Sequence, residues 1–327
     1  MRTLFTPSLL VVAALSFAGV AGCGDSSTKA PPAGDGGGNP NPAPAWRAAV
    51  GENGAFVQTF DDVHWQSRTL FGETLFSVTC VGNLDGWAAG THGTIAHTLD
   101  GGRTFQLQSS GLTASLRAIR FADASNGVVA GDDGALAITH DAGAHWSKVS
   151  TGTKSTLRGA AIAWGASTLF VVGDGGTLLR STDGGSTFHA STLEGATDLH
   201  GVAVDPAAHL ALVVDAAGAV FSSSDRGEHF RRETTAAAPL EAIAMRDDGS
   251  AALAVGAHGT ALVRDAAGGW RSLPTGVDVA LHAALVADDG ARMYAAGDSG
   301  TLLVSLGGAF QRVPVATTEA LYGLEDL

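Results

Sequence analysis

Six aspartates recur in short segments of similar pattern, and carboxylates repeated in this way could do chemistry. They are Asp61, Asp100, Asp141, Asp183, Asp225 and Asp265. If the fold brought Asp100, Asp141, Asp183 and Asp225 together, these four could serve as acid and base in catalysis or ligate a metal ion. The clearest segments have the form Ser/Thr-x-Asp-x-Gly and end in Phe or Trp, as in Ser181 to Phe188.

The same segment also has a purely structural explanation. An aspartate at a hairpin corner can accept hydrogen bonds from backbone N–H groups, while the glycine adopts a positive φ. The last copy, Ser305 to Phe310, has lost the aspartate, which a structural corner tolerates and an essential ligand does not. The copies also belong to separate repeats that would lie far apart. We therefore predict that these aspartates are structural, and we expect no metal and no cofactor.

The other reactive residue types show no arrangement typical of a catalytic or metal site. The 11 histidines are dispersed and lack the short His/Cys spacings of a zinc site. Cys80 aligns in the repeat with the apolar residues Phe121, Ile162, Val204 and Met245. We therefore expect Cys80 to be a buried, unreactive thiol.

Three markers recur along the chain with a period of about 40 residues, which is typical of a repeat architecture. The first is the aromatic residue that ends each segment: Trp65, Phe105, Trp146, Phe188, Phe230, Trp270 and Phe310. The second is a glycine pair: Gly51/Gly54, Gly90/Gly93, Gly131/Gly134, Gly173/Gly176, Gly256/Gly259 and Gly297/Gly300, with Asp215/Gly218 in the fifth repeat. The third is a leucine that opens an apolar run: Leu75, Leu116, Leu157, Leu199, Leu240, Leu281 and Leu321.

Each repeat contains four short apolar runs separated by turns rich in glycine and aspartate. In one repeat these runs cover 116–121, 127–130, 136–139 and 146–149. Four strands in about forty residues are typical of a propeller blade. The sequence therefore predicts an all-β, seven-bladed β-propeller over residues 46–327. The run 321–326 supplies the strand that the first repeat lacks and should pair in the sheet containing 47–68, so that both ends close one blade.

Composition and charge narrow the classes of function. The net charge is −13 and the chain has no block of basic residues, which disfavours nucleic-acid binding because that requires a cationic surface. The 45 glycines, against 10 prolines, are consistent with many tight turns.

The first 45 residues indicate export rather than a folded domain. Met1 and Arg2 precede an apolar run that ends in Val20-Ala21-Gly22-Cys23, which resembles a bacterial lipobox. We predict a lipoprotein signal peptide over 1–22, lipidation of Cys23, and a disordered tether over 23–45 that is rich in Gly, Pro and Asn. The protein would be exported and lipid-anchored in the bacterial cell envelope, periplasmic or surface-exposed. A transmembrane anchor is the alternative for the apolar run.

The repeated turn resembles the Asp-box, also known as the bacterial neuraminidase repeat. Together with the glycine pairs, the unit from Gly173 to Phe188 looks like the repeat of the photosystem II stability/assembly factor family. The resemblance covers about 46–327 and implies a seven-bladed propeller that binds protein. Asp-box repeats also occur in sialidases, which use a tyrosine nucleophile and three arginines. The chain has only Tyr294 and Tyr322, and it lacks the Arg-Ile-Pro segment of sialidases.

The resemblance favours a non-catalytic, envelope-anchored scaffold for protein binding or assembly, expected to be a monomer. The alternative is a propeller that binds glycans or hydrolyses glycosides as sialidases do. In the resembling family, arginines on one propeller face contact the partner, and Arg117 and Arg158 stand at matching positions.

We place the functional surface at one mouth of the central channel. The residue after each repeat leucine should occupy the same place in every blade, yet its type varies and is mostly polar or aromatic. These partner-binding candidates, called here the mouth ring, are Phe76, Arg117, Arg158, His200, Glu241, His282 and Tyr322. We expect the tips of the glycine-pair turns to surround the ring: His92, Asp132, Asp133, Asp174, His258 and Asp298. Glu241 is the only glutamate that we place near the channel, and the partner would be an envelope protein or a glycan.

Overall fold

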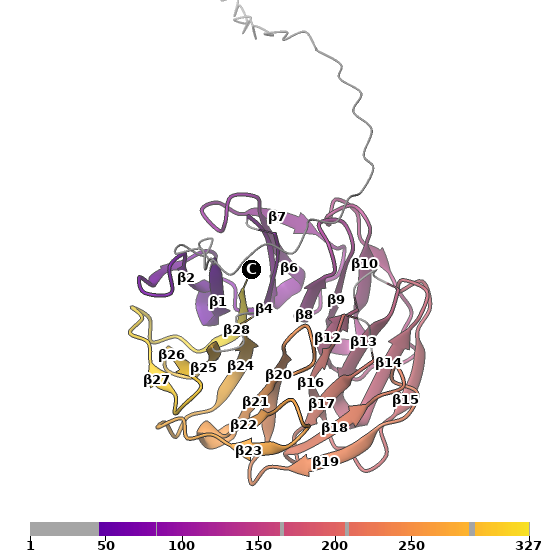
Figure 1. Cartoon of the computed structure of the whole chain (residues 1–327). Helices are drawn as coiled ribbons and strands as arrows, with labels where there is room; N and C mark the ends of the chain where they lie inside the picture. Colours follow the sequence, from indigo (N-terminus) through magenta and orange to yellow (C-terminus); the bar gives the residue numbers. More distant parts are fainter. Residues whose placement is uncertain (1–45, 83, 164–166, 207–208, 288–291, 327) are drawn as a thin grey trace, which may run out of the picture. The chain divides into compact units, whose positions relative to one another are not determined.

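The computed structural model describes residues 46–82, 84–163, 167–206, 209–287 and 292–326. The predicted signal peptide, Cys23 and tether lie outside this part of the chain. The described residues form seven four-stranded antiparallel sheets arranged in a ring (Figure 1). The fold is therefore the predicted all-β, seven-bladed propeller.

Each blade contributes one strand to the channel and places the other three successively outward. Blade one consists of β28, β1, β2 and β3, and blades two to seven follow as β4–β7 to β24–β27. The first, innermost strands are β4 (Leu75–Val81), β8 (Leu116–Phe121), β12 (Leu157–Ile162), β16 (Leu199–Val204), β20 (Leu240–Met245), β24 (Leu281–Val286) and β28 (Leu321–Asp326). The second strands are β1 (Arg47–Gly51), β5 (Asp85–Gly90), β9 (Gly127–Gly131), β13 (Leu169–Gly173), β17 (Ala211–Asp215), β21 (Ala252–Gly256) and β25 (Arg292–Gly297).

The outer half of each blade is formed by its third and fourth strands. The third strands are β2 (Ala55–Thr59), β6 (Thr94–Thr98), β10 (Leu136–Thr139), β14 (Thr177–Ser181), β18 (Ala219–Ser223), β22 (Ala261–Arg264) and β26 (Thr301–Leu306). The fourth strands are β3 (Gln66–Thr69), β7 (Gln106–Ser109), β11 (Ser147–Lys148), β15 (His189–Thr192), β19 (Arg231–Thr235), β23 (Trp270–Ser272) and β27 (Gln311–Arg312). The strand predicted over 146–149 is shorter in the structure, where only Ser147 and Lys148 pair with β10.

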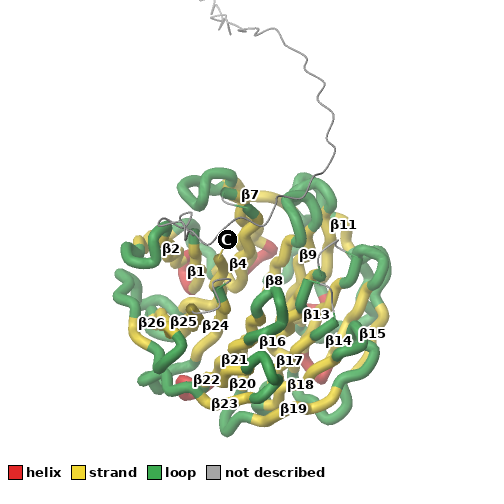
Figure 2. Tube along the Cα trace, in the orientation of Figure 1, coloured by secondary structure: helices red, strands yellow, loops and turns green. Residues whose placement is uncertain are grey.

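Tight turns join the second and third strands, and we call them glycine turns. Five contain a single turn of 3-10 helix: η1 (Glu52–Gly54), η2 (Thr91–Gly93), η3 (Asp132–Gly134), η4 (Asp174–Gly176) and η5 (Ala257–Gly259) (Figure 2). Gly131 shows why glycine precedes such a turn, because a Cβ there would lie 2.0 Å from the carbonyl oxygen of Ser115. In blade five Asp215 replaces this glycine, and its buried carboxylate accepts hydrogen bonds from the backbone N–H groups of Ala217 and Ala219.

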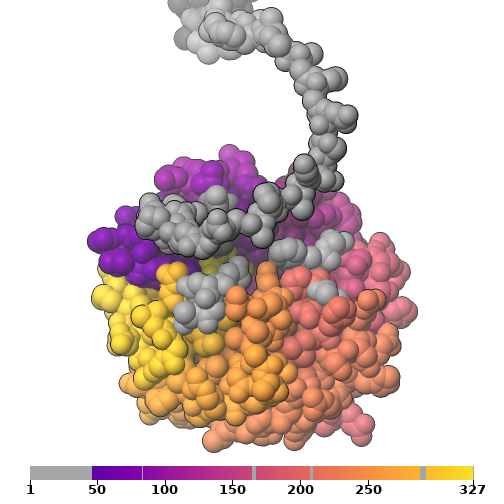
Figure 3. All heavy atoms as spheres, in the orientation of Figure 1, coloured from indigo at the N-terminus to yellow at the C-terminus, as the bar shows by residue number. Residues whose placement is uncertain are grey.

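The two ends of the propeller chain meet in blade one, as the sequence predicts. β28 pairs with β1, with Arg47 opposite Asp326 and Val50 opposite Gly323. In the space-filling view the C-terminal sector, in yellow, adjoins the N-terminal sector, in indigo (Figure 3). The buried Arg47 guanidinium forms ion pairs with Asp62 and Asp326, which joins the first strand pair to the turn after β2.

The hydrophobic core of the described residues consists of seven clusters, each shared by two neighbouring blades. Trp87 of blade two stacks on Phe121 of blade three, and Trp146 meets the Phe121 ring edge-on at 6.0 Å. In every blade the aromatic residue after the Asp-box turn packs toward the preceding blade. The repeated aromatic thus fills the space between blades. Within the described ranges, no helix has the length and apolar character needed to span a membrane.

Candidate functional site

The channel has two ends of different composition, because every first strand runs through it in the same direction. These strands begin at the end where the glycine turns lie, called the glycine-turn end. They finish at the end where the Asp-box turns lie, called the Asp-box end, since those turns follow the third strands.

A β-bulge occurs near the start of each first strand. In blade three the pairing with β9 shifts between Leu116 and Ala118, so Arg117 is the extra residue. The same shift falls at Phe76, Arg158, His200, Glu241, His282 and Tyr322 in the other blades. Bulges re-aim side chains and are common next to functional sites. All seven members of the mouth ring are therefore bulged residues.

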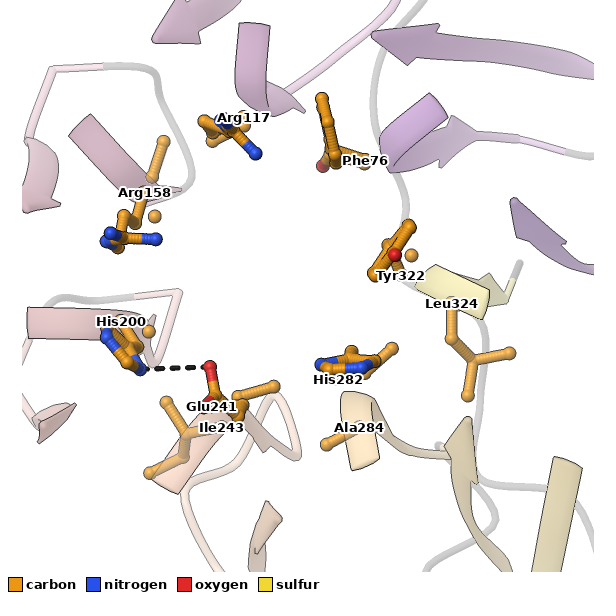
Figure 4. Close-up of a pocket in the computed structure, with 18 of the residues that line it drawn as sticks. Phe76, Arg117, Arg158, His200, Glu241, Ile243, His282, Ala284, Tyr322 and Leu324 are labelled. Atoms are coloured by element: carbon orange, nitrogen blue, oxygen red, sulfur yellow. Dashed lines mark ion pairs between the residues drawn. The ribbon is translucent and has the colours of Figure 1, made fainter. Parts of the chain in front are cut away.

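The bulges bring the whole mouth ring together around one cavity of about 110 Å³ at the glycine-turn end. Figure 4 shows the seven side chains arranged around the opening, one from each blade. The floor below them is formed by small and apolar residues of the same strands, including Ala118, Gly159 and Gly201.

Three members of the ring form ion pairs with glycine turns of their own blades. Arg117 Nε and Nη2 donate to the two carboxylate oxygens of Asp132 at 2.9 and 3.1 Å. Arg158 makes the equivalent pair with Asp174, and His282 Nε2 lies 2.8 Å from Asp298 Oδ1. The predicted turn residues Asp132, Asp174 and Asp298 thus do contact the ring.

The other three predicted turn residues differ from these. His92 pairs with Glu73 and His258 with Asp278, and both histidines are largely exposed. Asp133 occupies the left-handed central position of its turn, with φ of 57°. These three side chains therefore belong to the outer surface of the glycine-turn end.

His200 and Glu241 come from adjacent blades and form an ion pair across the mouth. His200 Nδ1 lies 3.0 Å from Glu241 Oε2 (Figure 4). Although burial opposes its protonation, the hydrogen bond and charge of Glu241 raise the pKa of His200. The hydrogen bond from His200 in turn lowers the pKa of Glu241. Each partner therefore favours the charged form of the other.

An aromatic group occupies the opposite side of the mouth. The rings of Phe76 and Tyr322 lie 5.6 Å apart, and Tyr322 lies 5.1 Å from His282. The Arg117 guanidinium stacks over Phe76, with Cζ 4.3 Å from the ring centroid. Burial raises the pKa of Tyr322, so its hydroxyl remains a hydrogen-bond donor at neutral pH. The mouth thus combines an aromatic side with a charged side.

The Asp-box aspartates lie on the turns at the other end and bind their own backbone. Asp183 Oδ1 accepts from the Thr187 N–H at 2.9 Å and from Ser181 Oγ, and Oδ2 accepts from Thr187 Oγ1. These hydrogen bonds lower the pKa of Asp183 to about 2. The same turn bonds recur at four others, Asp61, Asp100, Asp141 and Asp225, whereas Asp265 accepts from the N–H groups of Ala267 and Gly269.

Blade seven lacks the aspartate, and its turn is held by Ser305 Oγ, which donates to the Gly308 carbonyl. Across the described ranges, no group of three or more His, Cys, Asp or Glu side chains could hold a metal ion.

The Asp-box end of the channel contains charged residues that the sequence analysis missed. A cavity of about 400 Å³ there is lined by apolar residues together with Arg120, Asp247, Glu325 and Asp326. The expectation that Glu241 is the only glutamate near the channel is therefore wrong, because Glu325 also lines it. Arg120 and Glu325 share one repeat position that otherwise holds small or apolar residues, which is the signal that could have identified them.

Cys80 also lines this cavity and is half-buried, so it is less enclosed than predicted. The alignment with apolar residues correctly placed Cys80 on the first strand of its blade, but it did not predict how exposed the side chain is. Desolvation raises the pKa of the thiol well above its ordinary value. The thiol is thus protonated at neutral pH and a poor nucleophile.

Comparisons with known proteins place these features in a family. A family model described as photosynthesis system II assembly factor YCF48 matches residues 104–270. A structure titled "YCF48 bound to D1 peptide" is similar with a TM-score of 0.58 and 19% identity, covering 73% of this chain and 80% of that one. A structure of YCF48 from Cyanidioschyzon merolae has a TM-score of 0.58 and 15% identity, covering 74% and 85%. No curated protein matches the sequence.

Proposed function

Since the chain belongs to the photosystem II assembly factor YCF48 family, we propose that it is a non-catalytic scaffold whose mouth ring binds a protein segment. The observation that carries the proposal is the set of seven β-bulges, which present seven side chains of five residue types at one opening. A position used only for packing would repeat the same residue type in every blade. The side chains here instead differ from blade to blade.

The chemistry of the mouth suits a peptide that carries both charged and apolar groups. Arginine and aromatic residues dominate the energetics of protein interfaces, and Arg117 stacked on Phe76 combines both types. Two arginines and two histidines of the ring pair with four carboxylates of the ring and its turns. Charged groups of a bound segment can replace these internal partners, which keeps the free-energy cost of breaking the ion pairs small. One similar structure is titled as bound to a peptide, which supports a protein ligand for this family.

Glycan binding is the second candidate, favoured by the aromatic side of the mouth. Phe76 and Tyr322 could stack on a sugar ring while Glu241 accepts hydrogen bonds from its hydroxyls. Hydrolysis is a weaker candidate. Glu241 is engaged by His200 with a lowered pKa, which suits a stable ion pair better than a general acid.

The proposal includes attachment to the cell envelope. The lipobox-like segment that ends in Cys23 supports export, removal of residues 1–22 and lipidation. Two or more acyl chains would give stable anchoring. Mass spectrometry of the mature N-terminal peptide tests this part, and an unmodified Cys23 would overturn it.

Photo-crosslinking from the mouth tests the binding function. We expect a photoreactive phenylalanine analogue at Phe76 to crosslink a specific envelope protein in cells. The double change Arg117→Glu and Arg158→Glu should abolish this product while leaving the melting temperature nearly unchanged, because both guanidinium groups are partly solvent-exposed.

A matched control applies the same charge change elsewhere. Arg271→Glu with Arg312→Glu alters two exposed arginines on the outer strands β23 and β27 and should leave the crosslink intact. An unchanged crosslink in the mouth variant would show that the mouth is not the binding site. A crosslink to glycan instead of protein would favour the second candidate.

A further inference from the structure

The exposed large hydrophobic side chains are concentrated on one arc of the propeller. Five such residues occur in the described ranges, each 48–73% exposed: Val63, Leu84, Leu99, Leu107 and Leu306. All five belong to blades seven, one and two, which are consecutive in the ring (Figure 1). The remaining four blades contribute none of the five.

One repeat position shows this asymmetry most clearly. This position lies at the end of the third strand, where the Asp-box turn begins. The position is apolar in blades seven, one and two, where it holds Leu306, Phe60 and Leu99. In blades three to six it is polar, with His140, Thr182, Ser224 and Asp265. Because this position follows the third strand at an equivalent register in these blades, the fold itself does not require apolar residues there.

The apolar residues of these three blades lie on or beside turns at the Asp-box end, and two of them are direct neighbours. A Cβ built on Gly101 would lie 3.4 Å from both Leu84 Cδ2 and the Phe60 ring, so the three residues are neighbours. Arg292 pairs with Asp62, beside Val63, and lies opposite Leu306 in the β25–β26 ladder. We call Phe60, Val63, Leu84, Leu99 and Leu306 the apolar rim.

The chain enters the propeller beside the apolar rim. Trp46 packs against β5 and the Asp-box turn of blade two. A Cβ atom built on Gly86 would lie 2.8 Å from the Trp46 ring, and one built on Gly102 would lie 2.9 Å from it. β1 begins at Arg47, opposite Asp326, which places this entry at the Asp-box end. The 23 residues from Cys23 to Ala45 precede it. A flexible chain of that length has an r.m.s. extension of roughly 25–30 Å.

We propose that the apolar rim contacts the surface of the lipid bilayer that carries the anchor. The proposal rests on the envelope attachment proposed above, and it places the mouth ring on the face turned away from the membrane. Separate side chains that project from turn tips suit an interface of lipid headgroups and acyl chains better than a concave protein-binding groove. The anchor would keep the rim at high local concentration near the bilayer, so a weak apolar contact suffices.

One charge beside the rim also complements a lipid surface. Arg103 is exposed and stacks over Phe60, with Cζ 5.5 Å from the ring centroid, and its Nη1 donates to the Asp100 carbonyl. The rest of this guanidinium group can approach a lipid phosphate. The neighbouring Arg68 instead donates to the carbonyl groups of Gly102 and Arg103 and stacks over Phe56. Asp61 and Asp100 lie nearby, but their carboxylates are engaged by hydrogen bonds within the Asp-box turns.

An environment-sensitive fluorophore tests the contact directly. The chain from residue 23 onward would carry Cys23→Ser, Cys80→Ala and an N-terminal hexahistidine tag, and would be recruited to phosphatidylcholine vesicles containing a nickel-chelating lipid. A nitrobenzoxadiazole label is placed at Leu99→Cys or Leu306→Cys, and the matched controls are Thr182→Cys and Ser224→Cys at the equivalent position. We expect a several-fold rise in emission, quenched by doxyl lipids, for the first two labels only.

The tag replaces the lipid, so the result does not depend on whether Cys23 is modified in the cell. Equal emission from rim and control labels would overturn the proposal. Recruitment without any change in emission would overturn it too, and would leave a protein as the occupant of the rim. Hydrogen exchange on unlabelled protein gives a second measurement, with protection expected at 98–104 and not at 181–187. Because the crosslink from Phe76 is scored separately, failure at the rim is distinguishable from failure at the mouth.

Discussion

The two ends of the channel are built from the same seven strands, yet they treat charge in opposite ways. At the glycine-turn end Arg117, Arg158 and His282 each face a carboxylate of their own blade, and His200 faces Glu241. At the Asp-box end Glu325 shares a mainly apolar cavity with Asp247 and Asp326 and has Arg120 at 3.6 Å. Burial raises the pKa of Glu325 to about 7, whereas the pKa of Glu241 is lowered.

The difference shows that the blades place the residues that vary and could bind a partner at one end, and repeated stabilising turns at the other. The bulge at the glycine-turn end turns one side chain per blade into the opening, and its identity can vary because the strand pairing resumes below it. The Asp-box end repeats the same turn bonds in most blades. The ring closure between β28 and β1 runs along both strands, from Gly51 opposite Leu321 to Arg47 opposite Asp326. We expect substitutions of the ring arginines at the first end to alter binding, and substitutions in the Asp-box turns or the closing strand to alter stability.

Deleting residues 319–327 should have the largest effect. The deletion removes β28, exposes the edge of β1 and leaves the buried Arg47 without Asp326. Loss of the buried Leu321 and Leu324 alone should cost more than about 5 kcal/mol of unfolding free energy. Thermal denaturation followed by circular dichroism measures this loss. Removing residues 24–45 instead, which we predict to be tether, should leave the melting temperature unchanged, and equal effects of both deletions would refute closure by β28.

A substitution in one Asp-box turn should have a smaller effect on stability. Asp183→Ala leaves the Thr187 N–H without its acceptor and should lower the melting temperature without affecting the crosslink from Phe76. Because the folded-state pKa is lowered to about 2, this stabilisation should be lost as the pH falls from about 4 toward 2. The control is Thr182→Ala at the exposed neighbour, with no change expected. A calcium-dependent rise in the wild-type melting temperature would contradict a purely structural role.

The period and order of the strands were predictable because each marker has a local cause. Gly131 avoids a clash with Ser115, Asp183 caps its own turn, and Trp146 fills the space between blades. The members of the mouth ring were also predictable, since one residue after each leucine departs from the apolar pattern. The bulge that aims them was not, because it depends on pairing with the next strand.

The contacts between residues far apart in the sequence could not be predicted from it either. Asp62 lies next to an Asp-box aspartate, but it pairs with Arg47 and Arg292, whose positions follow only from closure of the ring. Glu325 was missed because it belongs to the last strand, whose alternation of inward and outward residues depends on the bulge at Tyr322. The likeness to family structures supplies the fold alone.

The smallest effect should come from Glu325 and should depend on pH. Its ordinary pKa is 4.5 and its folded-state pKa is about 7, so the folded protein holds this proton more tightly than the unfolded chain. The stability that it contributes is therefore present below about pH 4.5 and is lost as the pH rises through 7. Glu325→Gln should raise the unfolding free energy near pH 8 by on the order of 1 kcal/mol and flatten its dependence on pH.

Glu194→Gln, at an exposed glutamate, is the control. Glu241→Gln should have the opposite sign, because it removes the partner of His200, and denaturant melts at two pH values measure all three variants. If Glu325→Gln and Glu241→Gln shift stability in the same direction, the contrast between the two ends of the channel fails.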